Sequence, residues 1–180
     1  MVPQIMDETA MRRALMRVSH EIIEKNEDTD TFCIVGILRR GVSLANIIAD
    51  NLKSLGQNVL TANLDITFYR DDIAGHTGEA RVNRNNIDFD VNGKTIILVD
   101  DVLYTGRTAR AAMEAVISMG RPARIQLAVL IDRGHRELPI RADFVGKNVP
   151  SARSEKICVN IPPYDEQTNV VIVKKEGYNC

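Results

Sequence analysis

One segment of the sequence, Ile96–Thr108, constrains the fold more than any other. It begins with an unbroken apolar run, Ile96–Val99, which is typical of a strand buried on both faces of a parallel sheet. Two carboxylates, Asp100 and Asp101, end this run, and Thr105–Thr108 then begins a helix. A strand, a short loop with glycine and hydroxyl groups, and a helix N-terminus form the arrangement in which α/β proteins bind phosphate. The segment therefore predicts an α/β fold with a phosphate site at the end of a buried strand.

The two carboxylates indicate what else the ligand carries. Asp100 and Asp101 lie just before the predicted phosphate site, where they suit the hydroxyl groups of a ribose, or a magnesium ion that arrives with the ligand. Each half of the segment alone is also compatible with a structural role, because Asp-Asp can be a polar turn and Thr-Gly a helix cap. The sequence contains neither G-x-x-x-x-G-K-[ST] nor G-x-G-x-x-G, so it indicates neither a P-loop nucleoside triphosphatase nor a dinucleotide-binding fold. A ribose phosphate is the ligand that this order of residues favours.

The rest of the chain alternates between helical and strand-like patterns. Helices are predicted at 7–25, 41–55 and 105–119, and strands at 31–37, 59–68, 124–131, 156–161 and 170–174. This alternation favours a mostly parallel sheet that is covered by helices on both faces. With 180 residues, of which 44% are hydrophobic, the chain suits a single domain over residues 1–180.

Composition excludes several classes of protein. No apolar run approaches the roughly 20 residues of a membrane span, and no signal peptide is recognisable, so we expect a cytoplasmic protein without a membrane partner. Three cysteines without a C-x-x-C pair and three scattered histidines predict neither a disulfide framework nor a zinc site. The formal charge of −1 argues against broad nucleic-acid binding and leaves room only for a local basic patch.

Two further segments indicate anion chemistry. Residues 69–92 form a long polar stretch with weak periodicity, which is typical of a lid over a functional site. Gly36–Gly41 encloses Arg39 and Arg40 between small residues, which allow the backbone to approach an anion while the guanidinium groups supply forked donors. Either segment alone is also compatible with a solvated surface loop. Together with Ile96–Thr108, they favour a site that binds an anionic ligand and is covered by residues 69–92.

The segment Val99–Thr108 resembles the signature with which type I phosphoribosyltransferases bind phosphoribosyl diphosphate (PRPP). Together with Gln126–Asp143, Gly146–Pro150, Arg12–His20 and Asp65–Asp72, it resembles the family of bifunctional pyrimidine operon regulators and uracil phosphoribosyltransferases, the PyrR family. The resemblance implies a single-domain type I phosphoribosyltransferase fold with a mostly parallel sheet flanked by helices. It also implies a flexible lid at about 69–92 and a small hood formed by about 132–180 with N-terminal residues.

The resemblance implies a uracil phosphoribosyltransferase, which converts uracil and PRPP to UMP and diphosphate with Mg²⁺ as cofactor. The implied catalytic residues are Asp100, Asp101 and Arg133. Magnesium would be carried by PRPP and would lie near the two aspartates. PRPP would be bound by Arg39, Arg40, Arg81, Asp100, Asp101, Val102, Leu103, Tyr104, Thr105, Gly106, Arg107 and Thr108. The nucleobase would be bound by Arg133, Lys147 and Val149.

Tyr104 bears on the choice of base. Purine-specific relatives that resemble this signature usually carry an acid at this position, which handles the proton on N7 of the purine. A tyrosine has an ordinary pKa of about 10 and cannot act as a carboxylate base at neutral pH. The residue therefore favours uracil over a purine. Arg39 departs from the family pattern, in which threonine or a similar residue precedes the arginine.

The resemblance also implies regulation of pyrimidine biosynthetic genes by transcription attenuation. A homodimer or higher homo-oligomer would bind leader mRNA of the pyrimidine operon, depending on UMP or UTP. The matching RNA-binding positions are Arg17, His20, Arg136, Arg141 and Lys147, whereas Met16 replaces a hydroxyl residue of the family pattern. DNA is not an expected partner, because the residues before Thr31 are too few for a winged-helix domain. Two alternatives remain open: a PRPP- or nucleotide-sensing regulator with little catalysis, and a phosphoribosyltransferase for another base.

Overall fold

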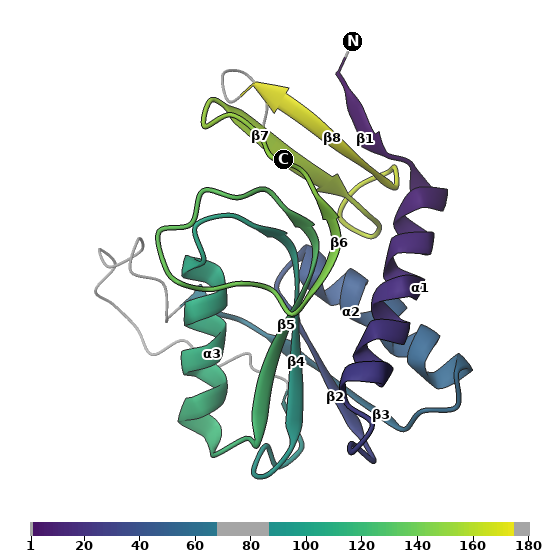
Figure 1. Ribbon diagram of the computed structural model, residues 1–180, viewed down its shortest axis with the longest axis vertical. Helices are drawn as coiled ribbons and strands as arrows, with labels where there is room; N and C mark the ends of the chain where they lie inside the picture. Colours follow the sequence, from purple (N-terminus) through teal and green to yellow (C-terminus); the bar gives the residue numbers. More distant parts are fainter. Residues whose placement is uncertain (1, 68–86, 175–180) are drawn as a thin grey trace.

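The structure is a computed structural model that describes residues 2–67 and 87–174. Helices and strands alternate through most of this part of the chain (Figure 1). In chain order the elements are β1 (Gln4–Met6), α1 (Glu8–Lys25), β2 (Phe32–Ile37), α2 (Arg40–Ser54), β3 (Val59–Leu64), β4 (Thr95–Leu103), α3 (Arg107–Met119), β5 (Arg124–Asp132), β6 (Phe144–Asn148), β7 (Glu155–Asn160) and β8 (Asn169–Lys174). This order confirms the expected α/β class.

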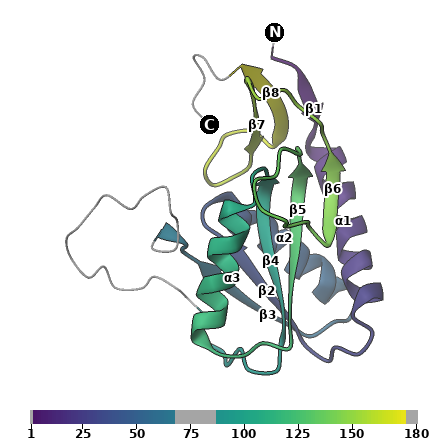
Figure 2. The ribbon, with the colours of Figure 1, turned by 60° about the vertical axis from the view of Figure 1, so that its left-hand side comes forward.

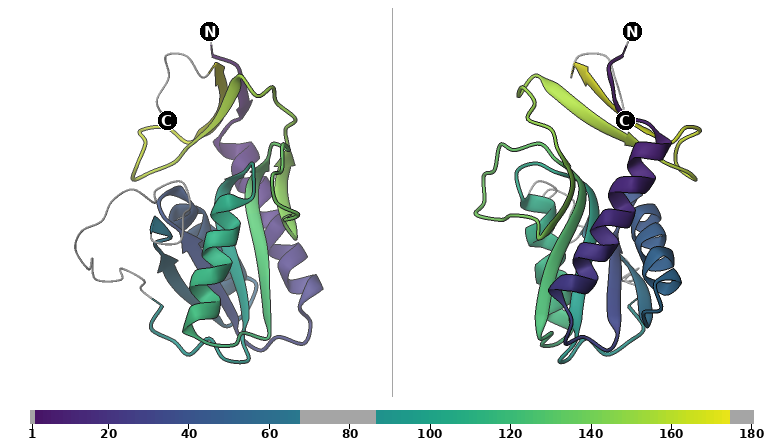
Figure 3. Two further views of the ribbon diagram at one scale, coloured as in Figure 1. Left: turned by 90° about the vertical axis from the view of Figure 1, so that its left-hand side faces the viewer. Right: turned by 45° about the vertical axis from the view of Figure 1, so that its right-hand side comes forward.

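A five-stranded sheet in the order β3-β2-β4-β5-β6 forms the centre of the molecule, and every neighbouring pair in it is parallel. Helices α1 and α2 cover one face and α3 covers the other, as the views in Figure 3 show. A parallel sheet must be covered on both faces, because its strands are apolar on both. The predicted sheet with helices on both faces is therefore confirmed.

Strand β4 is the central strand, and its apolar residues supply both halves of the core. Ile97 and Val99 pack toward α1 and α2, whereas Ile96 and Leu98 pack toward α3, and all four are buried. The strand is longer than the apolar run predicted, because it continues through the two aspartates to Leu103. Asp100 and Asp101 are therefore held by strand geometry at the carboxyl edge of the sheet, where the neighbouring parallel strands also end.

A second, smaller sheet in the order β1-β8-β7 is antiparallel. Figure 2 shows it above the carboxyl ends of β4, β5 and β6. The sequence did not predict β1 or β6. Strand β6 pairs with β5 and its Phe144 is buried in the core, so Phe144–Asn148 belong to the large sheet.

The predicted lid at about 69–92 lies mostly outside the described residues. Its last part is described, and there Ile87 and Phe89 pack against the core on the α3 side while Val91 is buried. These apolar side chains attach residues 87–92 to the body of the domain, so this part of the stretch is not a free loop.

One expectation about the cysteines is wrong. Cys158 of β7 is disulfide-bonded, although the sequence was expected to lack a disulfide framework, while Cys33 in β2 is free and buried. Within the described residues, no helix is both long and apolar enough to cross a membrane.

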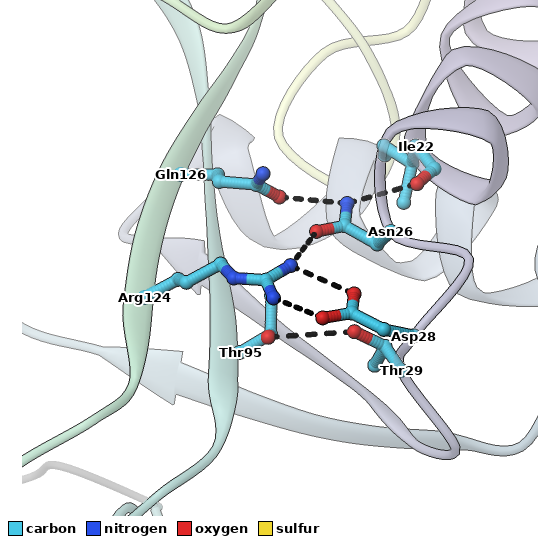
Figure 4. Close-up of polar contacts among 7 residues, drawn as sticks. All are labelled: Ile22, Asn26, Asp28, Thr29, Thr95, Arg124 and Gln126. Carbon is cyan, nitrogen blue, oxygen red and sulfur yellow. Dashed lines mark hydrogen bonds and ion pairs between the residues drawn. The ribbon is translucent and has the colours of Figure 1, made fainter.

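A buried polar network joins the end of α1 to β5 at the amino end of the large sheet (Figure 4). The side-chain amide of Asn26 donates to the Ile22 carbonyl and to Gln126 Oε1, each at 2.9 Å. Arg124 donates to Asn26 Oδ1 at 3.3 Å and forms an ion pair with Asp28. Asn26 is only 1% exposed, so its amide has no access to water and depends on these partners.

We expect Asn26→Leu to lower the free energy of unfolding by about 2 kcal/mol, because it leaves the buried Gln126 amide without its partner. Urea denaturation of the variant and the wild type measures this difference. The matched control is Asp28→Asn in the same network, whose exposed ion pair is screened by water and should contribute much less. If the two variants lose the same free energy of unfolding, the buried amide is not the main source of the network's contribution to stability.

Candidate functional site

A cavity of about 510 Å³ lies where β2, β3 and β4 end. Ligands of open α/β sheets bind at this edge, at the point where the strand order reverses. Here the order reverses between β2 and β4, because β3 lies to one side of β2 and β5 lies beyond β4. The cavity is lined by Leu38, Arg39, Arg40, Asp65, Ile66, Thr67, Asp100, Asp101, Val102 and Thr108.

Two glycines allow α2 to begin directly against β2 and β4. A Cβ atom on Gly41 would lie 2.5 Å from the Val99 carbonyl oxygen, and one on Gly36 would lie 2.6 Å from the Cα atom of Val42. Both distances are shorter than any van der Waals contact, and both neighbours are backbone atoms that cannot turn away. This close approach is what brings the two arginines after β2 beside the aspartates that end β4.

Arg39 and Arg40 differ in their surroundings. Arg39 is exposed at the start of α2, after a cis peptide bond with Leu38, and lines the cavity. Arg40 is half-buried and forms a bidentate ion pair with Asp165, with both nitrogen–oxygen distances at 2.9 Å. Asp165 also accepts the Ile161 N–H at 3.0 Å, and the pair lowers the pKa of Asp165. The segment after β7 is thus attached to the start of α2.

We expect Asp165→Asn to lower the free energy of unfolding by about 1 kcal/mol at pH 7, because the amide cannot accept both guanidinium donors. The folded-state pKa of Asp165 is lowered, so the pair stabilises the protein fully above the ordinary aspartate pKa of about 3.9 and is lost as the pH falls below it. Urea denaturation at pH 7, 5 and 3 should therefore give a constant difference from wild type at the first two values and a smaller one at pH 3. A difference that already disappears at pH 5 would contradict the assignment.

Asp100 and Asp101 lie side by side in the cavity. The Asp101 N–H donates to Asp100 Oδ1 at 2.9 Å, and the Val102 N–H donates to Asp101 Oδ1 at 2.7 Å. Burial raises the pKa of Asp101, whereas the positive charge of Arg40 opposes this rise. A half-buried carboxylate next to another gains from a cation or from hydroxyl donors. The pair therefore suits ribose hydroxyl groups or a divalent cation.

Residues Thr105–Thr108 lead into the first turn of α3, at the helix end that favours an anion. Gly106 precedes the helix with φ 94°, a left-handed conformation that other residues adopt only with strain. The first turn of α3 carries no acidic residue, and Thr108 lines the cavity. The N–H groups and the dipole of the helix thus face an anion without competition from a carboxylate in that turn.

The predicted signature residues do not all lie in the cavity. Val102 lines it, whereas the side chain of Leu103 is buried in the core on the α3 side, so Leu103 offers a ligand only backbone atoms. Tyr104 lies under Arg133, whose guanidinium carbon is 4.2 Å from the ring centroid. Arg107 pairs with Glu137. The predicted Arg81 lies outside the described residues.

Arg133 is the most buried of the predicted nucleobase residues. It is 4% exposed, and its Nη2 atom donates to the carbonyls of Ala152 and Glu155. Its Nε atom is buried without a hydrogen-bond partner among the described residues. The N–H of Val149 donates to the Asp132 carbonyl, which brings Val149 to the same strand end. Lys147 instead reaches toward β1, with its Nζ atom 3.4 Å from the Ile5 carbonyl oxygen, and is not brought to Arg133.

The predicted RNA-binding residues divide into two groups. Arg17 and His20 are exposed on α1, and Arg17 also donates to the Val145 and Gly146 carbonyls on β6, the strand that carries Lys147. Arg141 is exposed in the loop before β6. Arg136 is half-buried and turned inward, toward the carbonyl of Tyr104. Arg17, His20 and Lys147 therefore lie on one side of the domain. Arg136 does not join them, because its side chain contacts the Tyr104 carbonyl and Asp132.

Sequence reasoning missed three residues of the site. Asp65 and Thr67 line the cavity after β3, where Thr67 N–H and hydroxyl groups both bond Asp65 Oδ1. Asp65 lay inside the predicted strand 59–68, whereas β3 ends at Leu64, so the predicted strand end concealed that Asp65 and Thr67 lie at the same sheet edge as Asp100. Asp165 had no signal in the sequence, since only the fold brings it to Arg40 from 125 positions away.

Comparison with known proteins bears on this site. The chain matches the family model of the phosphoribosyl transferase domain over residues 1–166. It is 57% identical over 94% of its length to the "Bifunctional protein PyrR" of Caldicellulosiruptor bescii, of which it covers 93%. The proteins of the same name from Clostridioides difficile and Thermus aquaticus are 54% and 53% identical, over 94% and 97% of this chain and 96% and 97% of their own lengths.

Solved structures share the fold at much lower identity. A hypoxanthine phosphoribosyltransferase of Trypanosoma cruzi matches with a TM-score of 0.77 and 19% identity, covering 98% of this chain and 97% of the other. A hypoxanthine-guanine phosphoribosyltransferase of Bacillus anthracis matches with a TM-score of 0.72 and 16% identity, over 96% and 99% of the two chains. At these identities the similarity establishes the fold and leaves the acceptor base open.

Proposed function

The chain belongs to the phosphoribosyltransferases and, among them, to the PyrR family, and from this premise we propose that it transfers the ribose 5-phosphate group of PRPP to uracil, giving UMP and diphosphate. The observation that carries the proposal is the convergence of the aspartate pair, two arginines and the N-terminus of α3 at one cavity. A ribose, a diphosphate and a phosphate are the three parts of PRPP that these groups suit.

In this proposal the backbone of Tyr104–Thr108 binds the 5-phosphate, and Asp100 and Asp101 accept hydrogen bonds from the ribose hydroxyl groups. Arg39 supplies charge to the departing diphosphate, and Arg40 adds its positive charge while Asp165 holds it in place. Uracil N1 attacks the anomeric carbon as the bond to diphosphate breaks, and the N1 proton passes to the departing diphosphate or to water. The chain needs no nucleophile of its own, because positioning and electrostatic stabilisation are sufficient for this displacement.

Magnesium fits the residues that are present. Mg²⁺ in phosphate sites is held by one or two carboxylates and otherwise by substrate oxygens and water, and Asp100 and Asp101 are two such carboxylates at the cavity. When bound with PRPP, the ion supplies charge neutralisation for the diphosphate.

For the base we propose the space near Tyr104, Arg133 and Val149. The Nε atom of Arg133 and the hydroxyl group of Ser151 are buried and lack a partner among the described residues, so a bound base with carbonyl and N–H groups would satisfy them. Tyr104 offers no carboxylate for a purine N7 proton, which supports uracil as the acceptor.

A base-competition assay tests this part of the proposal. Diphosphate release from PRPP is measured with uracil, hypoxanthine or orotate as the acceptor, each in the presence of Mg²⁺. We expect release that depends on uracil. Release with hypoxanthine or orotate but not with uracil would support a phosphoribosyltransferase for another base, and no release with PRPP still bound would support a PRPP-sensing regulator.

We further propose that a cytoplasmic homo-oligomer of this chain regulates pyrimidine genes by binding leader mRNA when UMP or UTP is bound. The exposed basic residues on α1 and β6 support a local RNA surface, namely Arg17, His20 and Lys147, with Arg141 nearby in the chain. We expect binding of pyrimidine leader RNA that weakens as salt rises and is absent for scrambled RNA. No binding at low salt in the presence of UMP would contradict the regulatory role.

A further inference from the structure

The loop between β5 and β6 packs against the phosphate loop of the site. Three backbone N–H groups of this β5–β6 loop donate to carbonyls of the signature: Arg133 to Leu103 at 3.1 Å, and Glu137 and Leu138 to Thr105 at 3.0 and 3.1 Å. The side chains of Leu138 and Ile140 lie against Gly106. The two loops therefore form one packed unit.

Arg136 is the side chain that joins this unit together. Its Nη1 atom donates to the Tyr104 carbonyl at 2.8 Å and to the Gly134 carbonyl at 3.3 Å, and its Nε atom donates to the Ile140 carbonyl at 2.8 Å. Its Nη2 atom forms an ion pair with Asp132. A guanidinium group has five N–H donors, so four of them are already used.

These contacts fix the orientation of two peptide groups in the phosphate loop. The Tyr104 carbonyl points to Arg136, and the Thr105 carbonyl points to the N–H groups of Glu137 and Leu138. In a planar trans peptide the N–H group points opposite to the carbonyl. The N–H groups of Thr105 and Gly106 must therefore point away from the β5–β6 loop, which is the direction required to bind an anion on the other side.

We propose that Arg136 is a positioning residue of the phosphate site: by holding the Tyr104 carbonyl it orients the Thr105 N–H group toward the 5-phosphate of the ribose ligand. The positioning role of Arg136 rests on the proposed function in one respect: Tyr104–Thr108 is taken as the loop that binds the phosphate. It also reassigns Arg136, because a side chain with one N–H donor left is not available for a forked contact with an RNA phosphate.

The test is the affinity of Arg136→Met for ribose 5-phosphate, measured by titration calorimetry, which requires no acceptor base. We expect affinity to fall about tenfold, the loss of one oriented hydrogen bond to a charged group. In the transfer assay, KM for PRPP should rise by a similar factor, while kcat and KM for uracil change less than about twofold. The matched control, Arg121→Met, removes an exposed arginine at the far end of α3 and should leave all four quantities unchanged.

The outcomes separate this proposal from the proposed function. If the wild type does not bind ribose 5-phosphate but still forms UMP from PRPP, only the positioning role is contradicted; if it also forms no UMP, the proposed function is contradicted as well. If the wild type binds it and a folded Arg136→Met binds it equally well, the positioning role alone is contradicted. If Arg136→Met does not fold, Arg136→Lys decides, since it keeps the charge beside Asp132 but loses the fork that reaches Tyr104 and Ile140. That variant should bind about threefold or more weakly, and wild-type affinity in it would overturn the proposal.

Discussion

Asp101→Asn should lower kcat for transfer from PRPP by roughly 10²–10³-fold while leaving the protein at least as stable as the wild type. The loss in rate follows from removing one of the two cavity carboxylates that we propose bind the ribose hydroxyl groups and magnesium. Asparagine keeps the oxygen that accepts the Val102 N–H, so the turn after Asp101 is preserved.

Although Asp101→Asn lowers kcat, we expect it to leave the free energy of unfolding unchanged or higher. Burial raises the pKa of Asp101 in the folded protein above its unfolded value, so ionisation of this group at neutral pH opposes folding. Removing the charge relieves that cost. Urea denaturation at pH 7 should therefore show an unchanged or higher free energy of unfolding, and Asp50→Asn on the exposed face of α2 should change neither quantity. An inactive Asp101→Asn that is also strongly destabilised would contradict a functional role for the carboxylate.

Gly41→Ala should destabilise the protein by about 2–3 kcal/mol and reduce activity at least about 100-fold. The added Cβ atom would lie 2.5 Å from the Val99 carbonyl oxygen, so α2 must move away from β4 or distort its first turn. Either movement separates the arginines at the start of α2 from Asp100 and Asp101. A displacement of about 1 Å in a positioned site is enough for a loss of this size.

Gly56→Ala is the matched control for this change. Gly56 has φ 82°, but a Cβ atom there would contact nothing within 4 Å, and the residue follows α2 at the end remote from Arg40. Backbone strain alone should lower the free energy of unfolding by about 1 kcal/mol without affecting kcat. Unfolding in urea and steady-state kinetics distinguish the two variants. Equal activity in both would contradict the requirement for a close approach of α2 to β4.

The sequence predicted the parts of the fold that depend on local pattern. The N-terminus of α1 is confirmed, because Asp7 accepts the Ala10 N–H at 2.7 Å, and the apolar run of β4 is buried as expected. Strand β6 was missed because only Phe144 in it is fully buried, which leaves too few apolar residues for a periodic signal. Strand β1 is three residues long, and its pairing with β8 cannot be inferred from local sequence.

The candidate site divides in the same way. Asp100, Asp101 and the start of α3 are adjacent in sequence and were predicted together. Arg40 was predicted as a diphosphate ligand, but its bidentate partner Asp165 depends on contacts between distant segments. Arg136 illustrates the same limit, because its sequence position indicates an exposed basic residue while the fold turns it toward Tyr104. The sequence pattern predicts which residues belong to the site, whereas packing between distant segments determines which partners their side chains have.

The most direct test of the proposed function is formation of UMP from labelled uracil, with PRPP and Mg²⁺, by the wild type and Asp101→Asn side by side. We expect the wild type to form one UMP for each diphosphate released and the variant to form it roughly 10²–10³-fold more slowly. A wild type that releases diphosphate without forming UMP, or a variant as fast as the wild type, would contradict the assignment of this cavity as a uracil phosphoribosyltransferase site.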